Sequence, residues 1–151
     1  MTGPNGTNEA ESEIDPALRE AINATGVPFW RTLGITLLTA ERGLVRLHLP
    51  MRAELGTRRP EVMHGGAIAT LIDAAAGGCV QTMRTPDDAD WGGTSTIDMQ
   101  VSYLSAATGD VQAEGRILRA GKRIAFVDVT VTDDSGTALA VGRVTVSIAR
   151  R

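Results

Sequence analysis

The segment from Gly65 to Val80 constrains the fold of this chain more than any other part of the sequence. Apart from Thr70 and Asp73, its residues are apolar or small on almost every side. A helix that is apolar all round belongs in a protein interior, because none of its faces suits water. Its small residues also allow strands to pack close to the helix backbone. We therefore expect a long central helix that the rest of the chain encloses.

The remainder of the chain supplies the strands for such an enclosure. Apolar residues alternate with polar ones between residues 34 and 50. Four more strand patterns follow the helix, at 97–103, 111–118, 124–132 and 138–148, and the first of them places Ile97 on one face with Met99 and Val101. Consecutive strands joined by short turns form an antiparallel sheet with one buried face. The sequence therefore predicts an α+β hotdog fold, in which an antiparallel sheet wraps around one long central helix.

The sequence predicts a flexible tail and a short helix at the start of the chain, before the first strand pattern. Residues 1–14 are polar, acidic and rich in Gly and Asn, which is typical of a flexible tail. Asp15 and Pro16 then form an N-cap and first helical position, and Gly26 can end the short amphipathic helix that they begin. We expect residues 15–151 to form a single hotdog domain, since the length of the chain suits one domain.

Composition excludes several kinds of function. The net charge of −3 argues against nucleic acid as the main partner. Cys79 is the only cysteine, so neither an intramolecular disulfide nor a metal site built on several thiolates is possible. No apolar run resembles a signal peptide or is long enough to span a bilayer. We expect a cytoplasmic protein that acts without a metal, a cofactor or a membrane.

Asp73 is the residue that most suggests chemistry. Its carboxylate interrupts an apolar helix, and burying an ionised carboxylate is costly unless it is paired or hydrogen-bonded. Carboxylates held in such surroundings are frequent at functional sites. The structural alternative is that Asp73 faces a gap filled with solvent or pairs with a buried arginine.

His64, Gly65 and Gly66 mark the start of the same helix. Glycines there leave backbone N–H groups accessible, and a helix N-terminus carries unsatisfied donors and a partial positive charge. Such donors can stabilise a carbonyl oxygen that gains negative charge, although for the His-Gly-Gly motif alone a plain tight turn is the simpler interpretation. Asp73 follows His64 by nine positions, about two and a half turns at ~3.6 residues per turn, which is too far for a tight pair. A dimer could bring Asp73 of one subunit to the helix start of the other.

These residues together resemble a known family. The order His64-Gly65-Gly66, six residues and Asp73 is similar to the signature of the PaaI-type acyl-CoA thioesterases of the hotdog superfamily, and residues 96–104, 119–123 and 133–136 extend the resemblance over about 28–149. The resemblance implies that Asp73 is the general base or nucleophile and that the Gly66 N–H polarises the thioester carbonyl. It places Thr96 near the attacking water. It also implies active sites between the subunits of a homodimer or homotetramer, with CoA as part of the substrate and no cofactor.

The sequence departs from the family pattern before the helix. The family often has Asn six residues before the histidine and Gly three before it, where this chain has Arg58 and Glu61. We expect Arg58 to contact the acyl group or a CoA phosphate instead, and Glu61 either to act as a second carboxylate or simply to be exposed. A basic group between the predicted strands 111–118 and 124–132 either binds the CoA phosphates or is a solvated strand end. Its members are Arg119, Lys122 and Arg123.

Two other functions stay open at this point. The missing asparagine is compatible with a non-catalytic module that binds acyl-CoA without hydrolysing it. An enoyl-CoA hydratase on the same fold is the less favoured alternative, because His64 and Asp73 do not obviously face one substrate as an acid and a base.

Overall fold

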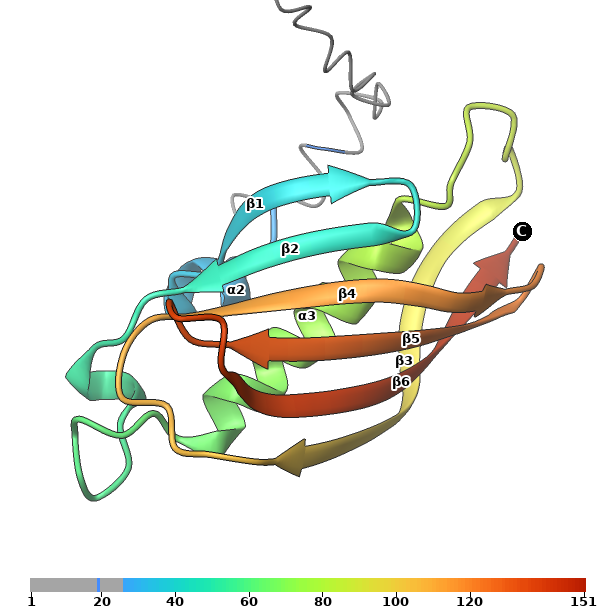
Figure 1. Cartoon of the computed structure of the whole chain (residues 1–151). Coiled ribbons are helices and arrows are strands. Elements are labelled where there is room, and N and C mark those ends of the chain that lie inside the picture. Colours follow the sequence, from blue (N-terminus) through green and yellow to red (C-terminus); the bar gives the residue numbers. More distant parts are fainter. Residues whose placement is uncertain (1–18, 20–25) are drawn as a thin grey trace, which may run out of the picture.

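The computed structural model describes Arg19 and residues 26–151, and in it an antiparallel sheet curves around one long helix, α3 (Figure 1). The helix runs over Gly65–Gln81, and the sheet has six strands in the order β1-β2-β4-β5-β6-β3. The strands are β1 (Thr36–Glu41), β2 (Leu44–Leu49), β3 (Trp91–Tyr103), β4 (Val111–Ala120), β5 (Ile124–Thr132) and β6 (Ala138–Arg150). The hotdog fold predicted from the sequence is confirmed.

Two short elements precede the central helix. Helix α2 (Pro28–Leu33) has proline in its first turn and ends at Gly34, whose positive φ of 83° is the left-handed conformation that glycine adopts readily. The single-turn 3₁₀ helix η1 (Ala53–Leu55) follows β2. The tail predicted for residues 1–14 and the helix predicted from Asp15 to Gly26 lie outside the described residues, apart from Arg19 and Gly26. No helix in the described part of the chain is long and apolar enough to cross a membrane.

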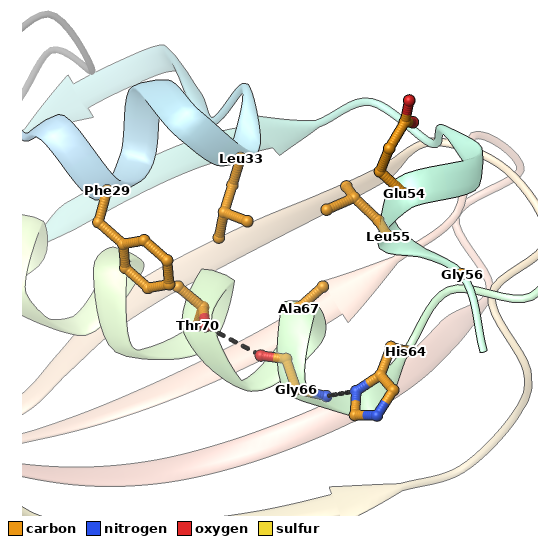
Figure 2. Close-up of a pocket in the computed structure, with 9 residues that line it drawn as sticks. All are labelled: Phe29, Leu33, Glu54, Leu55, Gly56, His64, Gly66, Ala67 and Thr70. Atoms are coloured by element: carbon orange, nitrogen blue, oxygen red, sulfur yellow. Dashed lines mark hydrogen bonds between the residues drawn. The ribbon is translucent and has the colours of Figure 1, made fainter.

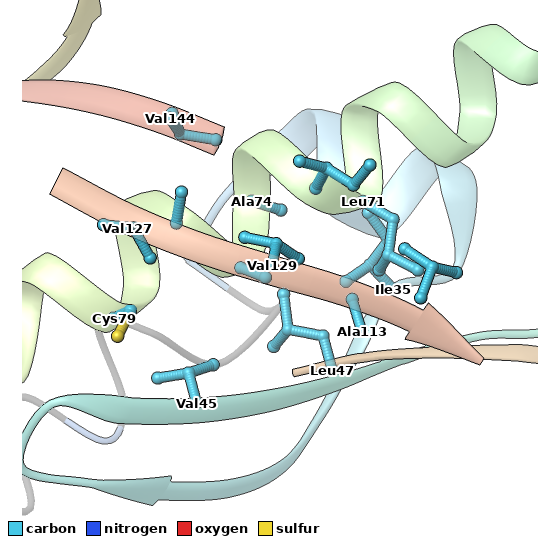
Figure 3. Close-up of a cluster of buried hydrophobic side chains, with 14 of the residues drawn as sticks. Ile35, Val45, Leu47, Leu71, Ala74, Cys79, Ala113, Val127, Val129 and Val144 are labelled. Atoms are coloured by element: carbon cyan, nitrogen blue, oxygen red, sulfur yellow. The ribbon is translucent and has the colours of Figure 1, made fainter. Parts of the chain in front are cut away.

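The core lies between α3 and the concave face of the sheet (Figure 3). Strand β5 shows how the sequence builds it, because Val127, Val129 and Val131 alternate with more exposed residues and turn their side chains toward the helix. The backbones of helix and sheet lie close together at Gly115 of β4. A Cβ atom there would lie 2.9 Å from the carbonyl oxygen of Ala75 in α3. The small residues of both elements therefore allow the close packing that the sequence predicted.

Strand β3 departs from simple alternation. Its register against β6 shifts between Thr96 and Asp98, so Ile97 is the extra residue of a β-bulge. Thr96 pairs with Val146 and Met99 pairs with Val144, and both of these β6 partners are buried on the helix side. The prediction that Ile97 shares a face with Met99 is wrong, and Ile97 is 59% exposed. The bulge instead brings Thr96 to the face that lies against α3.

Candidate active site

Helix α3 is not covered all round in this chain. Ten of its residues are buried, but Gly66, Thr70, Asp73 and Gly77 form one stripe that is exposed or half-buried. The expectation that Asp73 is buried is therefore wrong for the single chain, where its residue is exposed. The physical reason is that only two residues of this stripe are polar and its glycines suit either environment, so the segment looks apolar almost all round in the sequence without being enclosed on this side. We call these four residues the open stripe of α3.

Asp73 meets a hydroxyl from the sheet. The Thr96 Oγ1 atom donates a hydrogen bond of 2.6 Å to Asp73 Oδ1. Thr96 comes from β3, 23 residues further along the chain, and the bulge at Ile97 turns it toward the helix. The structure thus brings together two of the residues that the sequence singled out, with one carboxylate oxygen held by the threonine.

The contact between Asp73 and Thr96 is the middle one of three that join β3 to α3. Near the end of the helix, Gln81 Nε2 donates to Thr94 Oγ1 at 3.2 Å. At its start, the Tyr103 hydroxyl donates to the carbonyl oxygen of Gly65 at 2.8 Å. The helix partners Gly65, Asp73 and Gln81 are spaced eight residues apart, so each is turned by about 80° around the helix axis from the one before it, at ~3.6 residues per turn. Strand β3 therefore holds α3 by hydrogen bonds near both of its ends and at the carboxylate.

The Gly65–Gly66 peptide group connects a tyrosine to the histidine. Its carbonyl oxygen accepts the Tyr103 hydroxyl, and its N–H, which belongs to Gly66, donates to His64 Nδ1 at 2.8 Å (Figure 2). His64 is thus the N-cap of α3. An amide N–H can only donate, so Nδ1 is the acceptor, and a neutral ring then carries its proton on Nε2. This geometry leaves the His64 Nε2–H as a donor for another group.

The same contact affects the role predicted for Gly66. Its N–H, expected to face a thioester carbonyl, is directed at His64 Nδ1 instead. Within residues 26–151, the Gly65 N–H donates to no protein group. The described helix start therefore offers two donors that are not already used, the Gly65 N–H and the His64 Nε2–H.

A cavity of about 300 Å³ opens beside these donors (Figure 2). Three elements line it, namely α2, the η1 turn and the first two turns of α3. Most of the lining is apolar, and the residues are Phe29, Leu33, Glu54, Leu55, Gly56, His64, Gly66, Ala67 and Thr70. Asp73 does not line the cavity. It follows Gly66 by seven positions, about 10 Å along the helix axis at ~1.5 Å per residue.

The remaining predicted residues lie at two places. Arg58 and Glu61 are exposed in the loop that leads into α3, where Gly56 and Met63 form an isolated bridge. Arg119, Lys122 and Arg123 are exposed around the β4–β5 turn, and Lys122 accepts a hydrogen bond from Arg150 near the end of β6. This turn lies at the end of the molecule where α3 finishes, so one chain does not bring the basic group to His64 (Figure 1).

Two further observations bear on the chemistry. Burial raises the pKa of the Cys79 thiol to about 12, so this thiol stays protonated near neutral pH and is a poor nucleophile. Its Sγ instead donates to the carbonyl oxygen of Gly115. In the described part of the chain, no three His, Cys, Asp or Glu side chains are grouped as ligands of a metal ion.

The sequence matches a known protein family. The model of the thioesterase superfamily matches residues 61–140, which include the helix start, Asp73 and Thr96. A relative from Halobacterium salinarum, provisionally named an esterase, is 35% identical over 120 residues that make up 74% of this chain and 78% of the relative. The Escherichia coli protein named medium/long-chain acyl-CoA thioesterase YigI is 31% identical over 121 residues, 72% of this chain and 77% of that protein.

Solved structures agree with this match. A protein described as coming from the thioesterase superfamily is 32% identical and superposes with a TM-score of 0.75. The superposition covers 89% of this chain and 99% of that one. The similarity therefore extends over most of the chain.

Proposed function

This chain belongs to the thioesterase superfamily, and we propose that it hydrolyses acyl-CoA thioesters to a free acid and CoA. The name of its relative YigI supports acyl-CoA as the class of substrate. The observation that carries the proposal is the carboxylate of Asp73, which stands on the open stripe of α3 with one oxygen bound by Thr96. A carboxylate held in this way can take a proton from water or attack a carbonyl carbon.

In the general-base route, Asp73 takes a proton from a water molecule while the water oxygen bonds to the thioester carbon. The Thr96 hydroxyl donates to Asp73, so its oxygen lone pairs can accept a hydrogen bond from that water. The tetrahedral intermediate then breaks its C–S bond, and the CoA sulfur takes the proton from Asp73. In the nucleophile route, Asp73 itself forms an anhydride with the acyl group, CoA leaves, and water hydrolyses the anhydride.

The carbonyl oxygen needs donors while it carries negative charge. We assign this role to the Gly65 N–H and the His64 Nε2–H, which are the donors left at the helix start once Gly66 has bound His64 Nδ1. The positive end of the α3 dipole supports the same charge. The Gly66 peptide contributes indirectly, because it holds the imidazole in the tautomer that donates.

Asp73 and these donors are separated along one helix, and this separation favours a site shared by two subunits. A second copy of the chain would place its Asp73 near the His64 end of the first. Arg58, Arg119, Lys122 and Arg123 are then the proposed contacts for CoA phosphates, since all four are exposed cations. Water and Asp73 supply the nucleophile and the proton transfers, so the proposed reaction requires no cofactor.

The test of this proposal compares Asp73→Asn with Asp98→Asn on several acyl-CoAs. Asp98 is an exposed carboxylate two residues from Thr96, paired with Thr145 on the outer side of β3, so it controls for loss of charge. Asp73→Asn should lower kcat/KM by about 10²–10⁴-fold and Asp98→Asn should leave it nearly unchanged. Near-normal hydrolysis by folded Asp73→Asn would remove Asp73 from its role. Binding of acyl-CoA without turnover by the wild type would instead indicate a binding module.

Mixing two inactive variants tests whether the site is shared. Asp73→Asn subunits keep the helix start, and His64→Ala subunits keep the carboxylate, so a mixed dimer with a shared site contains one complete active site. Activity should therefore return after the two variants are unfolded together and refolded. No recovery from mixtures that demonstrably form mixed dimers would place each site within one chain. A single turnover in ¹⁸O-water would also separate the two routes, because only the nucleophile route can label Asp73.

A further inference from the structure

The cavity beside His64 has a polar end and an apolar end. Figure 2 shows His64 and Gly66 at one end, while Phe29 projects from α2 toward Thr70 at the other. Leu33 and Ala67 lie between them. Of the polar groups that line the cavity, the Thr70 hydroxyl is already used, since it donates to the Gly66 carbonyl oxygen at 2.9 Å. A molecule that enters from the His64 end therefore meets mainly carbon.

The outer wall of this cavity is held in place. Arg52, the residue before η1, donates through its guanidinium to the carbonyl oxygen of Thr32 in α2. Gly34 ends α2 in the left-handed conformation, and Ile35 directly after it is fully buried. Helix α2 is thus tied to the η1 turn on one side and to the core on the other. Phe29 and Leu33 consequently form a defined wall, although they lie outside the segment that the family model matches.

We infer that this cavity binds the acyl group of the thioester and that Phe29 and Leu33 set the length of acyl chain accepted. The inference rests on the proposed function, because it assumes that the thioester carbonyl lies at the donors of the helix start. The acyl group would then extend past Ala67 and Leu33 and end at the Phe29 ring. An open cavity of this size and lining is typical of a site for a small apolar group.

The chemistry of the lining favours an uncharged acyl group. Glu54 is the only acidic residue of the lining, and its carboxylate points away from the cavity in Figure 2. Its side chain is 77% exposed and lies 3.9 Å from the Arg52 guanidinium. No lysine or arginine lines the cavity to pair with a terminal carboxylate of the substrate. Since an unpaired carboxylate is costly to bury, carboxyacyl-CoAs should be poor substrates.

Two substitutions should shift the selectivity in opposite directions. Phe29→Ala opens the far end of the cavity, and Leu33→Trp narrows its middle. The measurement is kcat/KM for acetyl-, hexanoyl- and dodecanoyl-CoA, together with Kd values for the matching thioether analogues, which cannot be hydrolysed. Phe29→Ala should raise the ratio of dodecanoyl to hexanoyl kcat/KM by about tenfold, and Leu33→Trp should lower it by a similar factor. Phe126→Ala, which removes an exposed phenylalanine from β5 outside the cavity, should leave the ratio unchanged.

The two readouts keep this inference distinct from the proposed function. If the wild type hydrolyses acyl-CoAs but Phe29→Ala and Leu33→Trp both keep its chain-length profile, the acyl group lies elsewhere and the inference is overturned. If the wild type hydrolyses none of them, but the Kd values for the analogues shift as described, the cavity is an acyl site and hydrolysis is what fails. Absence of both hydrolysis and analogue binding would overturn both the inferred acyl site and the proposed function.

Discussion

Replacing Gly115 with alanine tests the close packing of helix and sheet. The added Cβ would lie 2.9 Å from the Ala75 carbonyl oxygen, 3.2 Å from the Ala75 carbonyl carbon and 3.4 Å from Cys79 Cβ. The two nearest atoms belong to the helix backbone, so no side-chain rotation relieves the contact, and α3 has to move away from β4. Overpacking of this kind costs about 1–3 kcal/mol of unfolding free energy. For a chain of this size, ~2 kcal/mol corresponds to about 4–8 °C in Tm.

The assay is urea and thermal unfolding at one fixed protein concentration, since self-association would otherwise change the apparent stability. Gly109→Ala is the matched control, because a Cβ at Gly109 meets nothing within 4 Å and its φ is not positive. The control should stay within about 0.5 kcal/mol of the wild type. Equal stability of Gly115→Ala and the wild type would refute the argument. If Gly115→Ala and Gly109→Ala lost equal amounts of unfolding free energy, the contact with Ala75 would not be the cause of the destabilisation.

Three further predictions concern the site and the loop before β3. Thr96→Val, which is nearly isosteric but cannot donate to Asp73, should lower kcat more than it raises KM, and wild-type kinetics would contradict the threonine's role. Tyr103→Phe removes the hydroxyl that donates to Gly65, so it should loosen the start of α3. The ¹⁵N spectrum of the His64 ring should change, and the pH profile of hydrolysis should shift. An unchanged spectrum would count against a connection between Tyr103 and His64. The backbone N–H of Thr85 holds the pKa of Asp88 below its ordinary value of 3.8. Because the folded-state pKa is the lower one, the stability that Asp88 contributes should be present above about pH 4 and lost as the pH falls further. Urea unfolding of wild type and Asp88→Asn from pH 7 to 3 checks this, and a constant difference would contradict it.

The sequence was informative about the fold because two of its patterns were strong, the long apolar segment of the helix and the alternation of the strands. The apolar segment from Gly65 to Val80 became α3, and the alternation of Val127, Val129 and Val131 became the concave face of β5. What periodicity could not show was the bulge at Ile97, since one inserted residue leaves the local pattern of apolar and polar residues intact. Register is a property of two strands, and the partner of β3 lies in the last segment of the chain.

The site was only partly predictable for a related reason. The family resemblance assigned Asp73 the role of base or nucleophile and placed Thr96 near the attacking water, and the hydrogen bond between the two side chains is compatible with these predictions. The exposure of Asp73 was only the alternative interpretation of the sequence, because alanine and glycine do not reveal which side of a helix is covered. The wall of the cavity was also missed, although Pro28 and Gly34 are ordinary signals for the start and end of a short helix.

The extra residue at Ile97 reverses the parity of the side chains on either side of it. From Thr94 to Thr96 the even-numbered side chains point toward the helix, and from Met99 to Tyr103 the odd-numbered ones do so. Removing Ile97 would restore regular alternation between Thr94 and Tyr103 and would force one of these two parts to turn over, exchanging its inward side chains for its outward ones. Substitutions along this strand should therefore be tolerated far more often than insertions or deletions. A substitution changes one side chain, whereas an insertion or deletion changes which side chains of the strand face the helix.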